Sequence, residues 1–435
     1  MNIIIAGAGQ VGFNLAKTLS IGHDVTVIDK NAEALHRIQE SLDILPLKGD
    51  IESTECYETF KNTHINLFIA VTNIDNVNLI ATAIATSVLN IDKTFVRLQR
   101  YFKDVFRIKE KLGIDEIIFP TRLASKNVAS LLHYPYANNI KLFKYTKHKL
   151  ISLRVSTNFI ERKILSQKFI VAGIEREKDF FIPQDDDVTI MPNDLLYLFG
   201  LEENIQKFYL SLGIGDQYKK IQNCVVYGGD ALGISIAKSF LEIGRDVKLI
   251  EKDFELCEKA DTELMGEASV INAKYSAHEL FKDENLNNAD LFVATSKNDE
   301  FNIIKCLEAK ERGIPKIIAV NNDMEYYNLM HSLGIIATRG PKINAYNKIM
   351  EEINSQSVII QKSFCGLKAT VLLRKIHDEK KKVKPLRLEE TKLFYIRDER
   401  LYLFHEKIIL LQGDIIFGIT TAKLLPKLKK WIYGL

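Results

Sequence analysis

The 435-residue chain lacks most features that mark secreted, metal-dependent or membrane-spanning proteins. Its five cysteines are scattered without C-x-x-C spacing, and its nine histidines show no paired ligand spacing. We therefore expect buried, reduced thiols and no structural metal site. No apolar run reaches the roughly 18 residues that a membrane-spanning helix needs, and no secretory signal is visible. These absences predict a soluble cytoplasmic protein, long enough for about two to four domains.

The chain also has little excess of charge of either sign, with 59 Lys and Arg against 56 Asp and Glu. The formal net charge is only +3, which argues against a bulk nucleic-acid-binding surface. Basic residues are concentrated locally, at Lys380, Lys381, Lys382 and Lys384 and again at Lys427, Lys429 and Lys430 beside Trp431. Such runs are typical of a solvated hairpin and a solvated final helix. A surface that contacts a partner or a membrane is the alternative that the sequence leaves open.

The chain repeats itself at about half its length. Residues 2–30 read NIIIAGAGQVGFNLAKTLSIGHDVTVIDK, and residues 223–252 read NCVVYGGDALGISIAKSFLEIGRDVKLIEK. This period is much longer than the roughly 20–50 residues of solenoid repeats, so it indicates duplication of one module. Further matches link residues 66–78 to 290–302, 112–120 to 333–341, 169–183 to 393–404 and 191–200 to 411–420.

Each half begins with short apolar runs that alternate with amphipathic stretches, as at Ile3–Ala6, Val25–Ile28 and Leu67–Ala70. This alternation predicts a parallel sheet with helices on both faces. The rest of each half has short β-branched and aromatic runs broken by turn residues such as Pro192-Asn193-Asp194. The predicted class is α/β, with two Rossmann-like doubly wound lobes, each followed by a small α+β lobe. The predicted domains are residues 1–130, 144–215, 220–350 and 360–435.

A glycine-rich loop, Gly7-x-Gly9-x-x-Gly12, lies between the first predicted strand and a predicted helix. The pattern alone is weak, but Asp29 ends the next strand about 20 residues on, as in dinucleotide-binding units. Gly7 makes the tight turn, Gly9 lets a pyrophosphate approach the backbone, and Gly12 lets helix and strand pack closely. The helix amides would hold the phosphates. Asp29 would accept hydrogen bonds from the ribose hydroxyls, which favours NAD(H) or an adenine nucleotide over NADP(H).

Four further polar residues follow predicted strands of the same lobe. Asp50 is placed for a contact with the adenine edge, and Thr72 and Asn73 follow the fourth strand, where such sheets bind ligands. Arg97 closes the fifth strand and is either a bidentate phosphate donor or a member of a surface ion pair. The predicted nucleotide-binding residues of the first half are Gly7, Ala8, Gly9, Gln10, Val11, Gly12, Asp29, Asp50, Thr72, Asn73 and Arg97.

The second half departs from this pattern at three positions: Asp230 replaces Gly9, Lys274 replaces Asp50, and Val320 replaces Arg97. A carboxylate at position 230 would repel a pyrophosphate by about 1–4 kcal/mol. The second pocket is therefore predicted to be vestigial or to bind a ligand with little phosphate, and Lys274 is predicted to neutralise Asp230 or Glu251. The corresponding residues are Gly228, Gly229, Asp230, Ala231, Leu232, Gly233 and Glu251.

The sequence offers little support for catalysis. A dehydrogenase needs an acid or base near the nicotinamide and a substrate domain, whereas the small lobes are short and Arg176 and Asp194 occupy turn or cap positions. Neither His133 nor His148 has a carboxylate at a spacing that would orient it. We therefore expect no enzyme, and an NAD-dependent oxidoreductase stays as the alternative.

The combination of GAGQVG, Asp29, Gly49-Asp50, AVTN (residues 70–73), Asn78 and Arg97 resembles the RCK, or potassium-transport nucleotide-binding, domain. Residues 169–200 resemble the RCK C-terminal domain. Two full copies in one chain resemble the TrkA family, the peripheral subunits of bacterial Trk potassium uptake systems.

This resemblance implies a function in potassium transport. It implies a homo-oligomeric ring that lies at the inner face of the plasma membrane, beneath a membrane-embedded Trk-type transporter subunit. Binding of NAD(H), ATP or ADP would shift the shape of the ring and gate K⁺ flux. An RCK sensor for a K⁺ channel or antiporter remains a second alternative.

Overall fold

The structure is a computed structural model, which describes residues 1–102, 104–165, 168–177, 179–184, 187–214, 221–273, 281–354, 359–366, 368–378, 380–404 and 408–435. The chain forms two compact units, one of residues 1–126 with 339–352 and one of residues 127–338 with 353–435. Among the helices of these described segments, none has the length and apolarity to cross a bilayer. All five cysteines are unpaired, and four of them are buried.

The first unit is built on a six-stranded sheet in the order β3-β2-β1-β5-β7-β8, and every neighbouring pair is parallel. This is the doubly wound order predicted from the sequence. The strands are β1 (Asn2–Ala6), β2 (Asp24–Asp29), β3 (Leu45–Lys48), β5 (Leu67–Ala70), β7 (Thr94–Arg97) and β8 (Glu116–Ile118), with a short parallel ladder of β4 (His64–Ile65) and β6 (Asn90–Ile91). The helices are α1 (Gln10–Leu19), α2 (Ala32–Gln39), η1 (Thr54–Phe60), α3 (Asp75–Val88) and α4 (Val105–Lys111).

The sheet of the first unit forms because its central strands are apolar on both faces. All four residues of β5 are buried, as are Ile3–Ala6 of β1, which is expected for parallel strands covered by helices on each side. Helix α1 buries Val11, Leu15 and Leu19, a helical spacing that faces the sheet.

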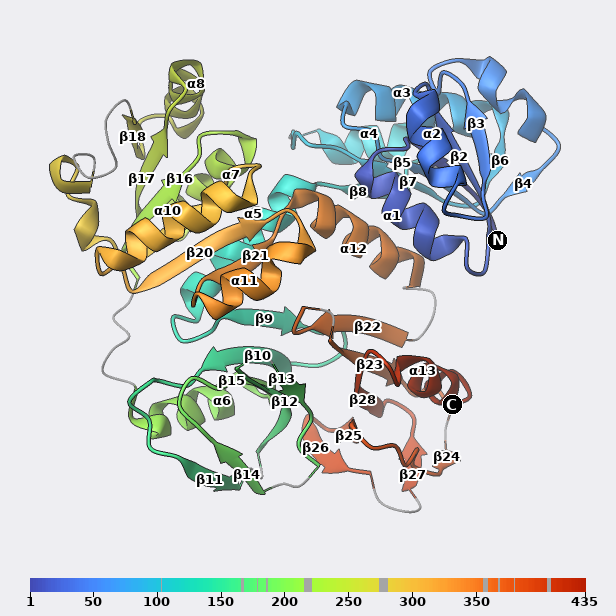
Figure 1. Ribbon diagram of the computed structural model, residues 1–435. Coiled ribbons are helices and arrows are strands. Elements are labelled where there is room, and N and C mark those ends of the chain that lie inside the picture. Colours follow the sequence, from blue (N-terminus) through green and yellow to red (C-terminus); the bar gives the residue numbers. More distant parts are fainter. Residues whose placement is uncertain are drawn as a thin grey trace. The chain divides into compact units, whose positions relative to one another are not determined.

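The second unit contains a sheet of the same order, β18-β17-β16-β19-β20-β21. The strands are β16 (Asn223–Tyr227), β17 (Asp246–Glu251), β18 (Ser269–Asn272), β19 (Leu291–Ala294), β20 (Lys316–Asn321) and β21 (Ile336–Arg339). The helices are α7 (Ala231–Leu241), α8 (Phe254–Leu264), η4 (Leu286–Asn288), α10 (Asp299–Glu311), η5 (Met324–Tyr326) and α11 (Tyr327–Ser332). The duplication predicted from the sequence is confirmed by this repeated topology (Figure 1).

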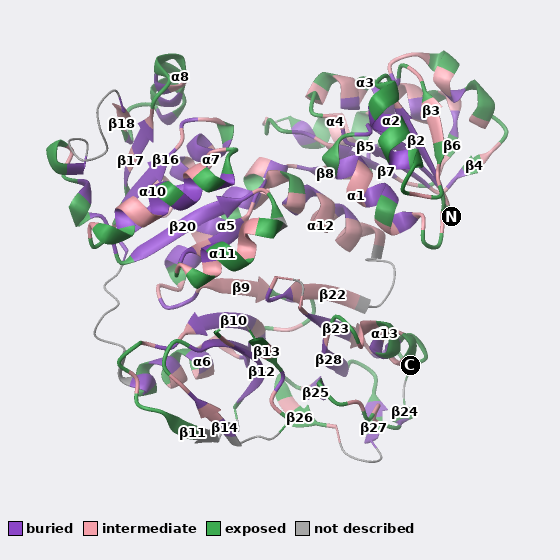
Figure 2. Ribbon diagram, in the orientation of Figure 1, coloured by how far each residue is buried: buried purple, intermediate pink, exposed green. Residues whose placement is uncertain are grey.

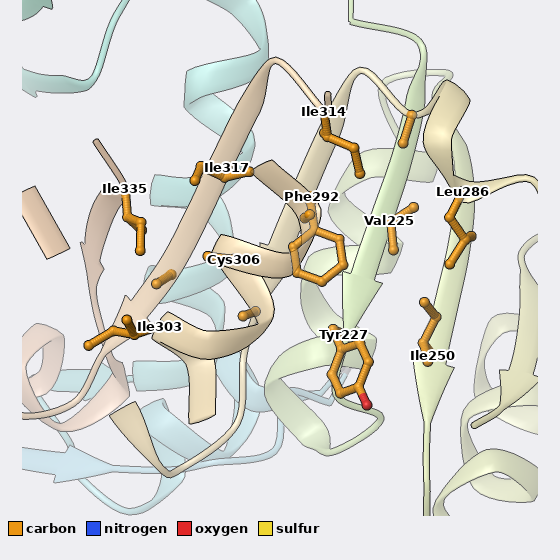
Figure 3. Packing of buried hydrophobic residues seen from close by; sticks show 14 of the residues in the cluster. Val225, Tyr227, Ile250, Leu286, Phe292, Ile303, Cys306, Ile314, Ile317 and Ile335 are labelled. Atoms are coloured by element: carbon orange, nitrogen blue, oxygen red, sulfur yellow. The ribbon is translucent and has the colours of Figure 1, made fainter. Parts of the chain in front are cut away.

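The core of this second sheet is continuous from strand to helix. Figure 3 shows Phe292 of β19 within the buried cluster that also contains Val225 of β16 and Cys306 of α10, and all three are at most 2% exposed. The Cys306 thiol donates to the carbonyl oxygen of Ile318 at 3.3 Å, and burial raises the pKa of the thiol. Burial of each large side chain stabilises this core by roughly 1.5–3 kcal/mol.

Two helices belong, in whole or in part, to the compact unit formed mainly by the other half of the chain. Helix α12 (Pro341–Asn354) follows the second sheet in sequence, yet its residues up to 352 belong to the first unit. There the Tyr346 hydroxyl hydrogen-bonds the Thr18 hydroxyl of α1 at 2.8 Å, and Lys348 Nζ lies 4.0 Å from Glu116 Oε1 of β8. The four domains predicted from the sequence did not anticipate this pairing, and their boundaries stay a prediction.

Helix α5 (Pro120–His133) shows the reciprocal arrangement, since residues 127–133 belong to the second unit. The buried Lys316 at the start of β20 donates to carbonyl oxygens at the end of this helix and in the turn after it. An ammonium group satisfies the free carbonyls that any helix leaves at its C-terminus, and burial lowers the pKa of Lys316 to about 7. The four acceptors, at 3.0–3.3 Å, belong to Leu131, Tyr134, Pro135 and Ala137.

Two small antiparallel sheets complete the second unit, and most of their residues are buried (Figure 2). They have the orders β13-β12-β15-β10-β9 and β22-β23-β28-β25-β26, so β12 matches β25 and β15 matches β28. The first copy contains β9 (Asn139–Leu142), β10 (Lys149–Arg154), β11 (Arg162–Leu165), β12 (Phe169–Arg176), β13 (Asp179–Phe181), β14 (Asp187–Ile190), β15 (Leu195–Gly200), α6 (Glu202–Tyr209) and the π-helix η2 (Leu210–Ile214). The second contains β22 (Ile359–Phe364), β23 (Ala369–Lys375), β24 (Lys380–Val383), β25 (Thr391–Arg397), β26 (Arg400–Leu403), β27 (Ile408–Leu411), β28 (Ile415–Thr421) and α13 (Leu425–Tyr433).

A buried ion pair recurs at the same place in both small sheets. Asp194 is fully buried and accepts from Arg176 Nε at 2.9 Å and from the Met191 amide at 2.8 Å. Asp414 and Arg397 repeat this geometry in the second copy, again with 2.9 Å to Nε. The turn position predicted for Asp194 is confirmed, because its carboxylate closes the turn before β15. Arg176 is instead the last residue of strand β12.

Candidate functional site

The candidate site of the first unit lies where the strand order reverses, between β1 and β5, at the carboxyl ends of the strands. Gly7 follows β1 with φ +116°, and a Cβ on it would stand 3.1 Å from both the backbone nitrogen and Cγ2 of Thr72. A Cβ on Gly12 would stand 1.9 Å from the Gly7 carbonyl oxygen. The loop therefore requires glycine at both positions, as the sequence predicted.

Helix α1 begins at this loop with an open N-terminus. Gly9 is its N-cap residue, and among the described residues no side chain caps the helix. A Cβ on Gly9 would have no atom within 4 Å, so the space before the helix is open. The first amides of a helix, here those of Gln10, Val11 and Gly12, have no partner within the helix, and they attract an anion.

Asp29 is fixed at the end of β2 by two backbone amides. Its Oδ2 accepts from the Ala8 amide at 2.6 Å, and its Oδ1 accepts from the Asn31 amide at 2.8 Å. The carboxylate therefore ties the glycine-rich loop to the second strand. A carboxylate oxygen can accept more than one hydrogen bond, so Asp29 can also accept from a ligand hydroxyl.

Asp50 lies after β3 and is held from two sides. The Glu52 amide donates to its Oδ1 at 2.9 Å, and Lys30 Nζ lies 3.1 Å from its Oδ2. The backbone hydrogen bond and the neighbouring ammonium group lower the pKa of Asp50. Lys30 directly follows Asp29, so this pair lies beside the Asp29 carboxylate in sequence.

Asn78 of α3 organises the loop after β5. Its side chain accepts from the Thr72 amide at 2.9 Å and donates to the carbonyl oxygens of Thr72 and Arg97 at 3.0 and 2.8 Å. The fully buried amide thus joins the ends of β5 and β7. The Asn73 carbonyl oxygen accepts from the Gln99 side chain, which fixes the other predicted residue of this loop.

Arg97 is half-buried at the end of β7, and its hydrogen-bonding capacity is mostly unused. Its Nη1 donates to the Val71 carbonyl oxygen at 3.4 Å, and its buried Nε has no partner among the described residues. Burial lowers the pKa of the guanidinium group. The ion pair predicted as the alternative role is not formed within the described chain, and the group remains suited to an anion.

In the second unit a side chain caps the N-terminus of the corresponding helix, α7. Asp230, in the place of Gly9, is the N-cap residue of α7, and its Oδ1 accepts from the Leu232 and Gly233 amides at 3.0 and 3.2 Å. These are the amides that a phosphate would need. Gly228 has φ +122°, and a Cβ on Gly233 would lie 1.8 Å from the Gly228 carbonyl oxygen, so the loop shape is kept while its anion position is filled.

Other features of the site recur in the second unit. Glu251 accepts from the Gly229 amide at 2.6 Å, as Asp29 does from Ala8. Asn302 bonds the Ser296 amide at 2.9 Å and the Val320 carbonyl oxygen at 2.9 Å, repeating the Asn78 arrangement. Val320 itself is fully buried and offers no cation. Ala231 begins α7, and the predicted contact of Lys274 lies outside the described residues.

One carboxylate in each unit was not predicted from the sequence. Asp75, at the start of α3, accepts from the amides of Gln99 and Arg100 at 2.7 and 2.9 Å. Asp299 does the same for Asn322 and Asp323 in the second unit. The signal that could have found them is their identity at matching places of the repeat, TNIDN and SKNDE.

Two observations concern positions away from this site. A cavity of about 430 Å³ in the first unit lies at the amino ends of the strands, lined by Asn2, Asp24 and Leu45 among others, and so is separate from the loop. No carboxylate at a useful spacing in the sequence was found to orient His148, but the fold brings one near it from a distant segment. Glu399 Oε2 lies 3.6 Å from its Nδ1 because the two small sheets pack together, and the buried ring stacks on Phe199. Burial lowers the pKa of His148.

Comparison with known proteins assigns these features to one family. The model of the TrkA-N domain matches residues 3–120 and again residues 224–339. A Trk system potassium uptake protein TrkA homolog 2 of Methanosarcina mazei is 26% identical over 445 residues, covering 97% of this chain and 98% of that protein. The Trk system potassium uptake protein TrkA of Vibrio alginolyticus is 24% identical and covers 95% of this chain and 94% of its own length.

Solved structures share the fold over the whole chain. The GsuK channel bound to NAD aligns with a TM-score of 0.62 at 14% identity, covering 100% of this chain and 79% of that one. The crystal structure of the GsuK RCK domain aligns with a TM-score of 0.59 at 13% identity. With two TrkA-N domains that together span more than half of its length, the chain belongs to the TrkA family.

Proposed function

We propose that the chain is a nucleotide-binding regulatory subunit of a membrane potassium uptake system of the Trk type. The observation that carries the proposal is the open N-terminus of α1 beside an oriented Asp29 carboxylate. Curated relatives that span nearly the whole chain are named Trk system potassium uptake proteins, which supports the role in transport. NAD(H) is the proposed ligand, with ATP or ADP as further adenine nucleotides for the same pocket.

Each part of the nucleotide has a proposed place in the first unit. The phosphates bind the amides of Gln10, Val11 and Gly12. Arg97 supplies a positive charge for the same phosphates. The ribose hydroxyls donate to Asp29, whose negative charge disfavours a 2′-phosphate. Asp50, held by Lys30, lies at the proposed adenine edge.

The second unit is proposed not to bind the phosphates of a nucleotide. Asp230 already satisfies the Leu232 and Gly233 amides, and its charge would repel an incoming phosphate. Ligand occupancy would therefore change in one half of each chain, and the other half would keep a fixed conformation.

We propose a switch and not an enzyme. Asp29 is held by backbone amides, and Asp50 is held by an amide and Lys30, which suits binding more than proton transfer. A nucleotide biases a gate only through different affinities for its two states, typically by about 1–3 kcal/mol.

The proposed assembly is a homo-oligomeric ring at the inner face of the plasma membrane, docked to the transporter subunit. Isoleucines at matching positions of the two halves support contacts with further subunits, because Ile80 of α3 and Ile304 of α10 are 45% and 52% exposed. Exposed apolar groups on equivalent helices are more stable when a neighbouring subunit buries them than when they remain in water.

The test replaces the carboxylate in one half at a time. Asp29→Asn removes charge-assisted acceptance and should weaken NADH binding by about 10- to 100-fold, since such hydrogen bonds contribute roughly 1.5–3 kcal/mol. Glu251→Gln is the matched control and should leave affinity unchanged. Calorimetry with NADH, NAD⁺, ATP and ADP measures both, and potassium uptake by cells that also carry the membrane subunit shows whether regulation follows binding.

Three outcomes would contradict the proposal. If Asp29→Asn bound NADH with wild-type affinity, Asp29 would not contact the ribose. If Glu251→Gln lowered the affinity equally, both halves would bind the nucleotide. Two tight, equivalent sites per chain would show that Asp230 does not silence the second unit.

A further inference from the structure

Charge is distributed unevenly between the two small lobes. Residues 360–435 contain 17 Lys and Arg against 8 Asp and Glu, whereas the matching residues 144–215 contain ten of each. The chain as a whole has a net charge of only +3, so the remaining residues are net negative. The same strands are present in both lobes, so the basic charge is not needed for the fold. A strong charge asymmetry of this kind points to a partner of opposite charge.

A two-stranded ribbon in the second small lobe combines lysines with exposed aliphatic side chains. In the antiparallel pair of β24 and β27, Lys380 lies opposite Leu411, and Lys382 lies opposite Ile409. All four are exposed, Ile409 by 49% and Leu411 by 37%. Side chains alternate between the faces of a strand, and the other face of the ribbon is buried through Val383, Ile408 and Leu410.

Helix α13 joins its own lysines to this ribbon. Leu428 and Ile432 are fully buried, while Lys427 and Lys430 are exposed on the outer side of the helix. The Trp431 indole donates to the carbonyl oxygen of Lys384, directly after β24, at 3.1 Å. The two basic runs, separated in sequence, therefore belong to one surface, which also exposes Tyr433 by 56%.

Most lysines of this surface have no carboxylate partner among the described residues. In the part of the chain that the structure describes, Lys381 pairs with Asp378 at 3.3 Å, but none of its basic neighbours forms an ion pair. Those neighbours are Lys380, Lys382, Lys384, Lys427 and Lys430. Their field acts outward into solvent and falls off over about a Debye length, ~10 Å at 0.1 M salt.

The first small lobe has the same ribbon with different chemistry. In β11 and β14, Lys163 lies opposite Thr189, the position that Ile409 occupies in the second lobe. Glu161 occupies the position of Lys380. One copy of the duplicated ribbon thus presents polar groups of both signs, and the other presents lysines beside aliphatic side chains.

We propose that this basic and apolar surface docks the protein onto an anionic lipid bilayer. The lysines meet lipid phosphates, and each adds to the attraction toward an anionic surface. Ile409, Leu411 and Tyr433 enter the boundary between headgroups and acyl chains, where aliphatic and aromatic side chains are favourable. A nucleic acid would use the lysines and leave these apolar groups in water. The inference does not depend on nucleotide binding.

The test measures binding of the full chain to vesicles of phosphatidylcholine alone and of phosphatidylcholine mixed with phosphatidylglycerol. Wild-type protein should sediment with the anionic vesicles and remain free from the neutral ones. Replacing Lys380, Lys382, Lys427 and Lys430 together by Gln should lower the partition coefficient on the order of 10²- to 10³-fold. The matched control replaces Lys144, Lys147, Lys168 and Lys207 by Gln, which changes net charge equally in the neutral lobe and should have little effect.

The double variant Ile409→Ser with Leu411→Ser separates a bilayer from a hydrophilic polyanion. It should weaken vesicle binding by roughly 10-fold or more, since apolar area no longer enters the interface. Unchanged vesicle binding in this variant would show that Ile409 and Leu411 do not enter the interface, and it would overturn the proposed insertion into the bilayer. Absence of wild-type binding to anionic vesicles, or equal losses in the two lysine variants, would overturn it as well. Circular dichroism of the same samples shows whether each variant is folded, because the substituted residues lie in the second unit. NADH calorimetry reports separately on the nucleotide site of the first unit.

Discussion

The difference between the two glycine-rich loops can be transferred from one half to the other by a single substitution. Gly9→Asp gives α1 the N-cap residue that α7 has in Asp230. The backbone permits the change, because Gly9 has φ −69° and a Cβ there would meet no atom within 4 Å. We expect the new carboxylate to accept from the Val11 and Gly12 amides, as Asp230 does from Leu232 and Gly233 at 3.0 and 3.2 Å.

The expected loss of affinity follows from Coulomb's law. A phosphate that approaches the same amides would stand about 4 Å from the carboxylate, where two unit charges repel by about 1 kcal/mol in water and about 4 kcal/mol at an effective dielectric constant of 20. Each 1.4 kcal/mol is about one decade of affinity. Nucleotide binding should therefore fall by roughly 5- to 1,000-fold. The folded state should be unaffected or slightly stabilised, since Asp exceeds Gly at an N-cap by only a few tenths of a kcal/mol.

Calorimetry with NADH and thermal unfolding measure these two quantities on one preparation. Gly9→Ser is the control, because serine caps the amides without a charge and so separates blocked amides from repulsion. If Gly9→Asp binds NADH as tightly as the wild-type chain while unfolding at the same temperature, the explanation of the silent second half is wrong.

Two further predictions concern the second unit. Burial lowers the pKa of His331 to about 4, so as pH falls below its ordinary value of 6.5 the unfolded chain takes up the proton first. Stability should fall by roughly 3 kcal/mol between pH 6.5 and 4, urea unfolding should show that His331→Gln removes this slope, and an equal slope in both proteins would rule the histidine out. Asp414→Ala should destabilise the unit by about 2–4 kcal/mol, because it leaves the Arg397 guanidinium and the Leu411 amide without the buried acceptor. Denaturant unfolding measures the change, and a loss no larger than that of an exposed Asp→Ala variant would contradict it.

The glycine-rich loop and the parallel sheet were predictable because their signals are local. A tight turn at Gly7 and close packing at Gly12 depend on residues within one strand and one helix, and the structure confirms both. The doubly wound order follows from alternating apolar and amphipathic runs. The duplication supplied a second reading of the same pattern, which is why the departure at Asp230 could be recognised as meaningful.

Long-range contacts were not predictable from the sequence. The carboxylate of Glu399 near His148 and the four carbonyl oxygens around Lys316 come from distant segments that only packing brings together. In the sequence Lys316 has the pattern of an ordinary charged residue at the start of a strand. No residue near it in the sequence indicates its partners. Nucleotide contacts of the first unit stay predictions, because the loop geometry is compatible with them without identifying a ligand.

The exchange of α5 and α12 has an evolutionary consequence. Residues 339–352 join the first unit and residues 127–133 join the second, so each unit includes a segment from the other half of the chain. An ancestor with one copy would have needed two chains to build the same units. In sequence and topology the present chain corresponds to two fused copies of one module, and these two members no longer have to be identical. Fusion allowed one member to acquire Asp230 while the other kept a bare loop. A symmetric dimer of identical chains cannot hold that combination.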